Sequence, residues 1–472
     1  MEAWTSGDIE SSKAALTSAI DSGDAPMARL LLGAIAFAEE DFGECQHQWE
    51  QAFREFKQGD DYARAARAAT CLAGLYYDVY GNESASRGWL GRADRLLERA
   101  GRCVERGYYE LALVACSVRD ASRLEESAAV ALDLAIEFKD PDLEARALAD
   151  GGLALINQGQ LAKGFARLDE AMAAVTSGEV RDPMMGGTIY CALLTACERT
   201  GELRRAEEWT RAATDFAAKQ FAGSLPLLHA HCRLAYGTVL CDAGRWPEAE
   251  EQILGLVGHS STQSVPKLAA AAGYLANLRM LQGRIDEAAE VIAPYADHFE
   301  VCEPLARLHF RKGEFDLAAA VISRALQELV GDRLRAGKLL GLLVDVELAR
   351  GDLDAADLAA ERLADYAADS DSAILRAESN LADGRIAAAR RMDASAVEAF
   401  ESGLNALGEE ERPILSATIR LELAQALASS DVPRAIDEAR VALATFERVG
   451  APRDIERAVE LLDRLGSSAT VA

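Results

Sequence analysis

The sequence predicts an all-α protein, a solenoid built from repeated pairs of antiparallel helices. A short turn recurs twelve times between residues 7 and 430, so the mean spacing is (430 − 7)/11, about 38.5 residues. Small and larger apolar residues recur about 5, 9 and 12 positions after the turns, which places them on one face of the following helix. No alternating strand pattern or hairpin dipeptide interrupts the series.

The clearest copies lie side by side in residues 142–210, where helices turn at Gly159 and Gly201. Gly164, Leu168 and Ala171 follow the first of these turns at the expected offsets. The series weakens near residue 392 and then returns. In chain order the predicted turn positions are Gly7, Glu40, Gly81, Arg119, Gly159, Gly201, Gly244, Gly283, Gly313, Gly351, Met392 and Ser430.

The prolines support this division into helices, because proline is tolerated in the first turn of a helix and disrupts its interior. Ten of the eleven prolines stand before or within the first turn of a predicted helix. Pro294 alone falls late in a helix pattern, within the shortest interval between turns, from Gly283 to Gly313. A bend or defect is therefore predicted near residues 283–313.

The repeats are expected to fill residues 1–450. Residues 451–466 have the pattern of a C-terminal capping helix, and residues 467–472 are expected to form a flexible tail. Terminal repeats expose apolar faces unless they are capped, so self-association is left open.

Composition restricts the classes of function. Half of the residues are hydrophobic, no apolar run is long enough to span a membrane, and the N-terminus does not resemble a secretion signal. Nine scattered cysteines without a Cys-x-x-Cys pair favour reduced thiols and a cytoplasmic location. The formal charge of −27 argues against direct binding to nucleic acid.

The turns have the form G-D/E/R-L/F/W-x-x-A and resemble the tetratricopeptide repeat, although the period is longer than the usual 34 residues. The longer period is similar to the MalT-like variant found in LuxR-type transcription regulators. Residues 119–217 and the phrase VGAPRDIERA (449–458) resemble the helical region of actinobacterial LuxR-type proteins. The resemblance implies a right-handed superhelix of about twelve hairpins. Neither the nucleotide-binding motif nor the DNA-binding domain of those regulators is found in this sequence.

The sequence contains no recognised catalytic or metal-binding motif, so no enzyme, cofactor or metal is predicted. His229 and His231 point about 200° apart on a helix and cannot share a metal ion. Pairing of His229 with Cys232 is a weaker alternative to ordinary packing. Cys191 and Cys197 lie about 9 Å apart along one predicted helix, too far for a disulfide.

In tetratricopeptide-like solenoids the first helix of each pair lines the concave side, and this geometry selects a polar band in the central repeats. Neighbouring repeats are expected to offer mainly Ala, Leu, Cys and Phe there. The band could fix an extended peptide or a small polar ligand, and the alternative is that it is simply solvated. The candidate groove residues are Asn157, Thr195, Glu198, Arg199, His231, Thr238, Asp242, Asn277, Arg307 and Arg311.

These observations predict a non-enzymatic, regulatory scaffold that binds a protein or peptide in its concave groove. The alternative is a small-molecule sensor, related to LuxR-type regulators, that signals to a separate effector. Which partner or ligand is bound does not follow from the sequence.

Overall fold

The structure is a computed structural model that describes residues 9–22, 25–117, 120–220, 226–257, 264–408 and 412–469. Within these ranges every regular element is a helix, and one isolated bridge joins Asp120 to Val330. The first helices of the repeats are α3 (Ala25–Ala38), α5 (Tyr62–Asp78), α7 (Glu105–Ser117), α9 (Pro141–Asn157), α11 (Pro183–Thr200), α13 (Pro226–Asp242), α15 (Val265–Leu281), α17 (Cys302–Arg311), α19 (Arg333–Arg350), α21 (Ala373–Ala389) and α23 (Pro413–Leu427). The second helices are α2 (Ile9–Ser22), α4 (Phe42–Gln58), α6 (Glu83–Ala100), α8 (Ala121–Phe138), α10 (Leu161–Ser177), α12 (Leu203–Gln220), α14 (Trp246–Val257), α16 (Ile285–Ile292), α18 (Phe315–Glu328), α20 (Leu353–Ala368), α22 (Asp393–Leu407) and α24 (Val432–Val449).

The all-α solenoid of helical hairpins is confirmed, and its right-handed sense stays a prediction. The chain reverses in the left-handed backbone region at eight of the predicted turns, from Glu40 to Gly351. Near residue 392 the left-handed residue is Arg391, with a φ of 60°, so the predicted turn was one residue late. Gly7 and Arg119 lie outside the described residues.

Proline ends a helix at the predicted irregular repeat. Because Pro294 has no amide N–H and its ring clashes with the preceding helical turn, α16 stops at Ile292. The chain continues through two 3₁₀ turns, η1 (Ala293–Tyr295) and η2 (Phe299–Val301), before the short α17 begins. Both helices of this repeat are therefore short, and a bend of the superhelix here stays a prediction.

The last helix, α25 (Pro452–Ala469), packs against α24 and contributes Leu461 and Leu465 to a buried cluster. It runs beyond residue 466, into the segment predicted to be a tail. Its role as a cap stays a prediction, and residues 470–472 are not among the described ones.

Small residues let paired helices approach closely. A Cβ added to Gly164 of α10 would lie 2.7 Å from the backbone oxygen of Gly152 in α9. Leu168 and Ala171, at the next two repeat offsets, are completely buried. The small residues at the repeat offsets thus allow the backbones of paired helices to come into contact, as dense interior packing requires.

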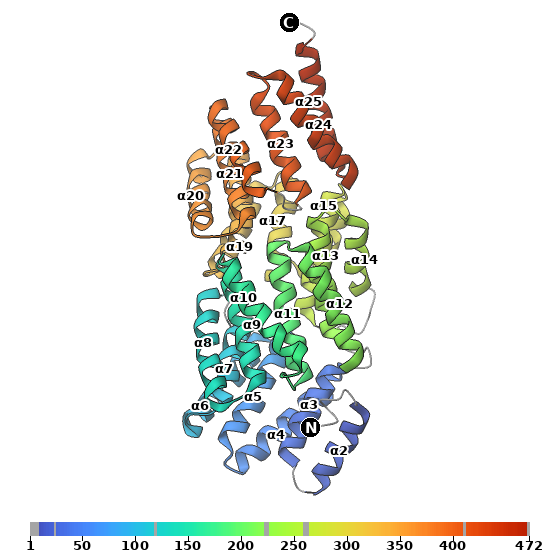
Figure 1. The fold of residues 1–472 in the computed structure, drawn as a ribbon, viewed down its shortest axis with the longest axis vertical. Coiled ribbons are helices and arrows are strands. Elements are labelled where there is room, and N and C mark those ends of the chain that lie inside the picture. The colour runs from blue at the N-terminus through green and yellow to red at the C-terminus, as the bar shows by residue number, and fades with distance from the viewer. Residues whose placement is uncertain are drawn as a thin grey trace.

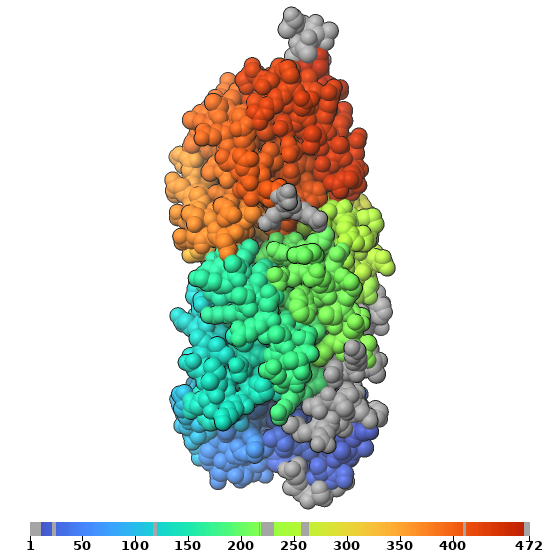
Figure 2. All heavy atoms as spheres, viewed as in Figure 1, coloured from blue at the N-terminus to red at the C-terminus, as the bar shows by residue number. Residues whose placement is uncertain are grey.

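The solenoid winds back on itself, so that residues far apart in sequence lie side by side. Figure 1 shows α8–α14 below α20–α25, and Figure 2 shows the two groups in contact across the middle of the molecule. We call α2–α14 the first coil and α15–α25 the second coil. One hydrophobic cluster runs from Ile35 and Leu193 to Val344 and Ile386, so the two coils share a core.

Backbone and side-chain contacts join the coils along what we call the inter-coil seam, where residues 78, 81, 121–122, 159–162, 199, 201, 242 and 244 meet residues 264, 266, 330–332, 370–371, 412–413 and 449. Asp371 makes three hydrogen bonds across the seam. Its carboxylate accepts hydrogen bonds from Leu161 N (2.6 Å) and Ala162 N (3.0 Å), although these residues are 210 and 209 positions away in sequence. The Asp371 amide donates to Gly159 O (3.0 Å). Asp371 therefore caps α10 from the second coil, since the local cap residue, Gln160, makes no side-chain capping bond.

Candidate ligand-binding interior

All ten candidate groove residues lie on first helices, as the repeat geometry predicts. Asn157 ends α9, while Thr195, Glu198 and Arg199 lie near the end of α11. The others come from α13, α15 and α17. Their assignment as a binding site stays a prediction.

The Arg199 side chain forms hydrogen bonds within the protein. Its guanidinium donates to Asn157 Oδ1 (2.9 Å) and to Asp332 Oδ2 (2.7 Å) of the second coil. The Asp332 side chain is only 1% exposed. Burial acts to raise the pKa of Asp332, but Arg335 and Arg199 outweigh it and hold the pKa below its ordinary value. Arg199 and Asn157 therefore contribute to joining the coils.

Thr195, Glu198 and His231 lie close together on facing helices. Thr195 Oγ1 is 2.9 Å from His231 Nε2, and the hydroxyl of Tyr274 in α15 donates to Glu198. Glu198 and His231 line a cavity of about 170 Å³. Its full lining is Asp78, Glu198, His231, Leu234, Ala235, Pro266, Lys267, Leu268, Ala270, Ala271 and Tyr274.

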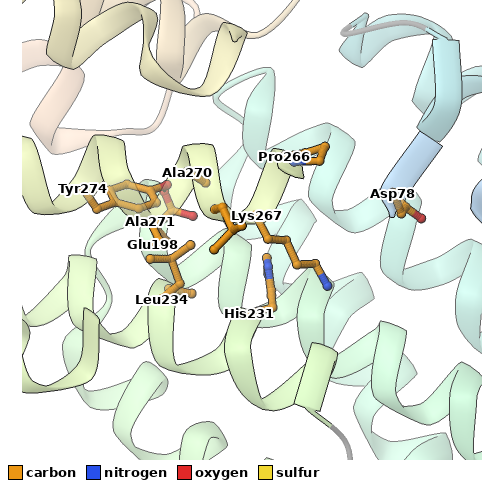
Figure 3. A pocket seen from close by; sticks show the side chains of 11 residues that line it. Asp78, Glu198, His231, Leu234, Pro266, Lys267, Ala270, Ala271 and Tyr274 are labelled. Carbon is orange, nitrogen blue, oxygen red and sulfur yellow. The ribbon is translucent and has the colours of Figure 1, made fainter. Parts of the chain in front are cut away.

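The cavity has two polar regions separated by apolar side chains. Figure 3 shows Lys267 reaching from α15 past His231, on the side of Asp78, while Glu198 and Tyr274 lie together on the other side. Leu234 and Ala271 belong to the wall of the same cavity. The site thus combines a cation, two carboxylates and an apolar surface.

His231 is uncharged at neutral pH. Burial lowers its pKa to about 4, and the positive charges of Lys267 and Arg199 act in the same direction. Asp78 shows the opposite effect, because burial raises the pKa of a carboxyl group and Lys267 only partly offsets this. Yet the Asp78 side chain is exposed to solvent. A group that touches water while surrounded by protein is expected on the wall of an interior space.

A second group of charges lines the interior of the second coil. Arg307 donates to Glu303 Oε1 (2.8 Å), and these side chains remain 35% and 33% exposed. Burial acts to raise the pKa of Glu303, but Arg307 and Lys338 reverse the effect and lower it. Arg385 pairs with Asp345 at 2.6 Å on the next two first helices. Charges of both signs therefore alternate along this wall.

The remaining candidates have separate surroundings. Asp242 pairs with Arg412 across the seam, and Thr238 donates to the backbone oxygen of Leu234 in its own helix (3.0 Å). Asn277 Oδ1 is buried and has no hydrogen-bond partner among the described residues. Arg311 is half-buried at the end of α17.

The sequence analysis missed several charged residues that stand at the same offsets as the candidate groove residues. Arg146 and Lys338 stand 13 positions before their turns, the offset that selected His231, and Asp78 stands at the offset that selected Glu198. Asp78 and Lys338 are thus exceptions to the expectation that neighbouring repeats offer mainly Ala, Leu, Cys and Phe at these offsets. Lys267 and Tyr274 stand 16 and 9 positions before Gly283, outside the offsets that selected the candidates.

Among the described residues no group of three His, Cys, Asp or Glu side chains is placed to hold a metal ion. The His229 side chain is not described, so its pairing with Cys232 is untested. All nine cysteines are free thiols. Trp49 and Trp246 are buried, and Trp89 and Trp209 are half-buried. None of the described helices is sufficiently long and apolar to cross a membrane.

The fold and its interior define an all-α helical-repeat solenoid with tetratricopeptide-like hairpins. No protein-family model and no curated protein matches the sequence. One similar solved chain belongs to the crystal structure of the APC/C hetero-tetramer Cut9–Hcn1, with 15% identity, a TM-score of 0.42, and coverage of 98% of this chain and 94% of that chain. Another is a tetratricopeptide repeat protein from Parabacteroides merdae, with 14% identity, a TM-score of 0.34, and coverage of 60% of this chain and 98% of that chain. Neither similarity assigns a role to a residue of this chain.

Proposed function

We propose that the chain is a non-enzymatic scaffold that binds an extended segment of a partner protein along its interior, with a regulatory role in the cytoplasm. The observation that supports this proposal is the alternating charge on the inner face of the second coil. Glu303 and Arg307 keep about a third of their surface exposed to solvent, so they can exchange their mutual contact for contacts with a partner. A peptide with both acidic and basic residues fits such a wall.

The test compares two arginines that both form ion pairs. Arg307 pairs with Glu303 on the same first helix, whereas Arg390 pairs with Asp357 of a second helix. The protein and the variants Arg307→Ala and Arg390→Ala are used as bait in the native host, and retained proteins are quantified by mass spectrometry. Loss of a stoichiometric partner in Arg307→Ala alone supports the proposal. Equal retention by both variants refutes this inner face as the binding site.

A small-molecule receptor is the second candidate. The cavity between α11, α13 and α15 favours it, because convergent polar groups in an apolar concavity are typical of ligand sites. The resemblance of residues 119–217 to LuxR-type regulators agrees with such a role, in which occupancy would be passed to a separate effector. A metabolite that binds the folded protein must raise its thermal stability. If a broad metabolite panel leaves the melting temperature unchanged, the receptor role is refuted.

A further inference from the structure

We propose that the cavity of Lys267, Glu198 and Tyr274 binds a small linear zwitterion, with the ligand's carboxylate at Lys267 and its ammonium group at Glu198. The inference rests on the receptor role and deepens it by naming the ligand class. It is independent of the peptide-binding scaffold, which concerns the inner face of the second coil.

The size of the cavity limits the ligand. Pockets for drug-sized molecules have volumes of about 300–1,000 Å³. At about 170 Å³, this cavity is suited to a smaller metabolite. Its walls come from α5, α11, α13 and α15, so the ligand would contact both coils.

The charges of the lining select a zwitterion. Lys267 is the one lysine or arginine among the described lining residues, and Asp78 and Glu198 are the carboxylates. His231 adds no charge at neutral pH because its pKa is about 4. A ligand with one charge would be complementary either to Lys267 or to Glu198, whereas a ligand with both charges would be complementary to both groups. Because each ligand charge then meets a group of opposite sign as it leaves water, a ligand with both charges is favoured.

The arrangement of the polar groups places the two ligand charges at opposite ends. Lys267 and Glu198 lie on different sides of the cavity in Figure 3, and Ala270 and Ala271 of α15 line the space with Leu234. The ligand therefore needs an apolar segment between its charged ends. ω-Amino acids have such a segment between their charged ends. Ordinary α-amino acids do not, because their ammonium and carboxylate groups are attached to the same carbon.

Tyr274 prepares Glu198 for this role. Its hydroxyl donates to one carboxylate oxygen of Glu198, which orients the group. An ionised carboxylate offers about four acceptor positions, so an ammonium group can bind at the same time. Burial and the charge of Glu198 raise the pKa of Tyr274, so the phenol keeps its proton at neutral pH.

The cavity also lies at the seam. Ser264, just before α15, donates from its hydroxyl to the backbone oxygen of Asp78 at the end of α5. Pro266 of the lining faces the turn at Gly81, at 3.9 Å from the position of an added Cβ. Occupancy of the cavity would therefore hold the start of the second coil against the first.

The experiment measures binding by calorimetry for a length series of glycine, β-alanine, γ-aminobutyrate, δ-aminovalerate and ε-aminocaproate. Each is compared with the amine and the carboxylic acid of the same chain length. We expect the longer members to bind, and each single-charge analogue to bind at least about tenfold more weakly. Equal binding of a single-charge analogue, or no binding across the series, would overturn the proposal.

Three variants locate the binding. Lys267→Met and Glu198→Gln should each weaken binding of the best zwitterion at least about tenfold, whereas Lys163→Met, at an exposed lysine of α10, should leave it unchanged. If Lys267→Met does not fold, two milder variants replace it. Glu198→Gln keeps an acceptor for Tyr274 and should weaken binding, whereas Lys267→Arg keeps the positive charge and should retain binding. Binding that survives in Lys267→Met and in Glu198→Gln overturns the assignment. A stabilising metabolite that is not a zwitterion overturns this inference while leaving the receptor role supported.

Discussion

The inter-coil seam can be tested at a single turn, because two turn glycines share a backbone conformation and differ in their neighbours. Gly159 has a φ of +85° and Gly351 a φ of +80°. A Cβ built on Gly159 would lie 2.5 Å from Ser370 Oγ and 2.8 Å from Ser370 Cβ, whereas one built on Gly351 meets nothing within 4 Å. Alanine at either position suffers the same left-handed backbone penalty, about 1–2 kcal/mol.

Gly159→Ala should cost more than this shared penalty, because the second coil must move away. Ser370 Oγ donates to Gly159 O at 2.9 Å, and the neighbouring Asp371 caps α10 at 2.6 Å and 3.0 Å. Losing an N-cap costs about 0.5–2 kcal/mol, and each other hydrogen bond contributes about 0.5–1.5 kcal/mol. Since the loop can relax partially, we expect Gly159→Ala to lose about 1–3 kcal/mol more than Gly351→Ala.

Urea unfolding followed by circular dichroism gives the difference between the two variants. Long repeat arrays do not always unfold in a single step, so hydrogen exchange at the amides of Leu161 and Ala162 provides a local measurement. Exchange there should accelerate in Gly159→Ala and remain unchanged in Gly351→Ala. Adding Ser370→Gly to Gly159→Ala should recover part of the lost stability, since it removes the clashing atoms. Equal losses in the two glycine variants would refute the reasoning.

Two further perturbations test the buried site and the repeat core. His231 has a folded-state pKa of about 4 against 6.5 in the unfolded chain, so the unfolded state alone gains a proton as pH falls through this window, and stability is lost. The pH dependence is measured as the difference in unfolding free energy between pH 7 and pH 4, and replacing His231 with Gln should reduce this difference by up to about 3 kcal/mol. An unchanged difference would contradict a neutral histidine at this position. Gly164→Ala places a Cβ 2.7 Å from Gly152 O, where no rotamer change can relieve the overlap. It should lower stability by about 1–3 kcal/mol despite the better helix propensity of alanine, and a stabilised variant would contradict the close helix approach.

The repeat architecture was predictable because the features that define each hairpin lie close together in the sequence. Each hairpin needs a turn, a helix start that tolerates proline and a face of small residues, and these features lie within about 40 residues of one another. Offsets within one repeat also place side chains correctly on the first helices, as Glu198 and His231 show. The same rule, applied to every repeat, would have found Asp78, Arg146 and Lys338.

Contacts between coils were not predictable in this way. Asp371 lies 210 residues from Leu161, and no periodic pattern relates the two. Arg199 and Asp242 were expected to face an open groove, but each forms an ion pair across the seam, with Asp332 and Arg412. Whether coils meet depends on small rotations between successive repeats that accumulate along the solenoid, and no single residue specifies them.

The seam changes how stability and binding are connected in this chain. In an open solenoid each repeat contacts only its neighbours, so a perturbation at one repeat decays along the array. Here Asp371, Asp332 and Arg412 join repeats that are far apart in sequence, so loss of one contact weakens two regions at once. A ligand that holds α15 against α5 therefore favours the closed arrangement along the whole seam by population shift. Hydrogen exchange at Leu161 and Ala162, which lie outside the cavity, should then slow when the cavity is filled. Slowing confined to α13 and α15 would show that occupancy remains a local event.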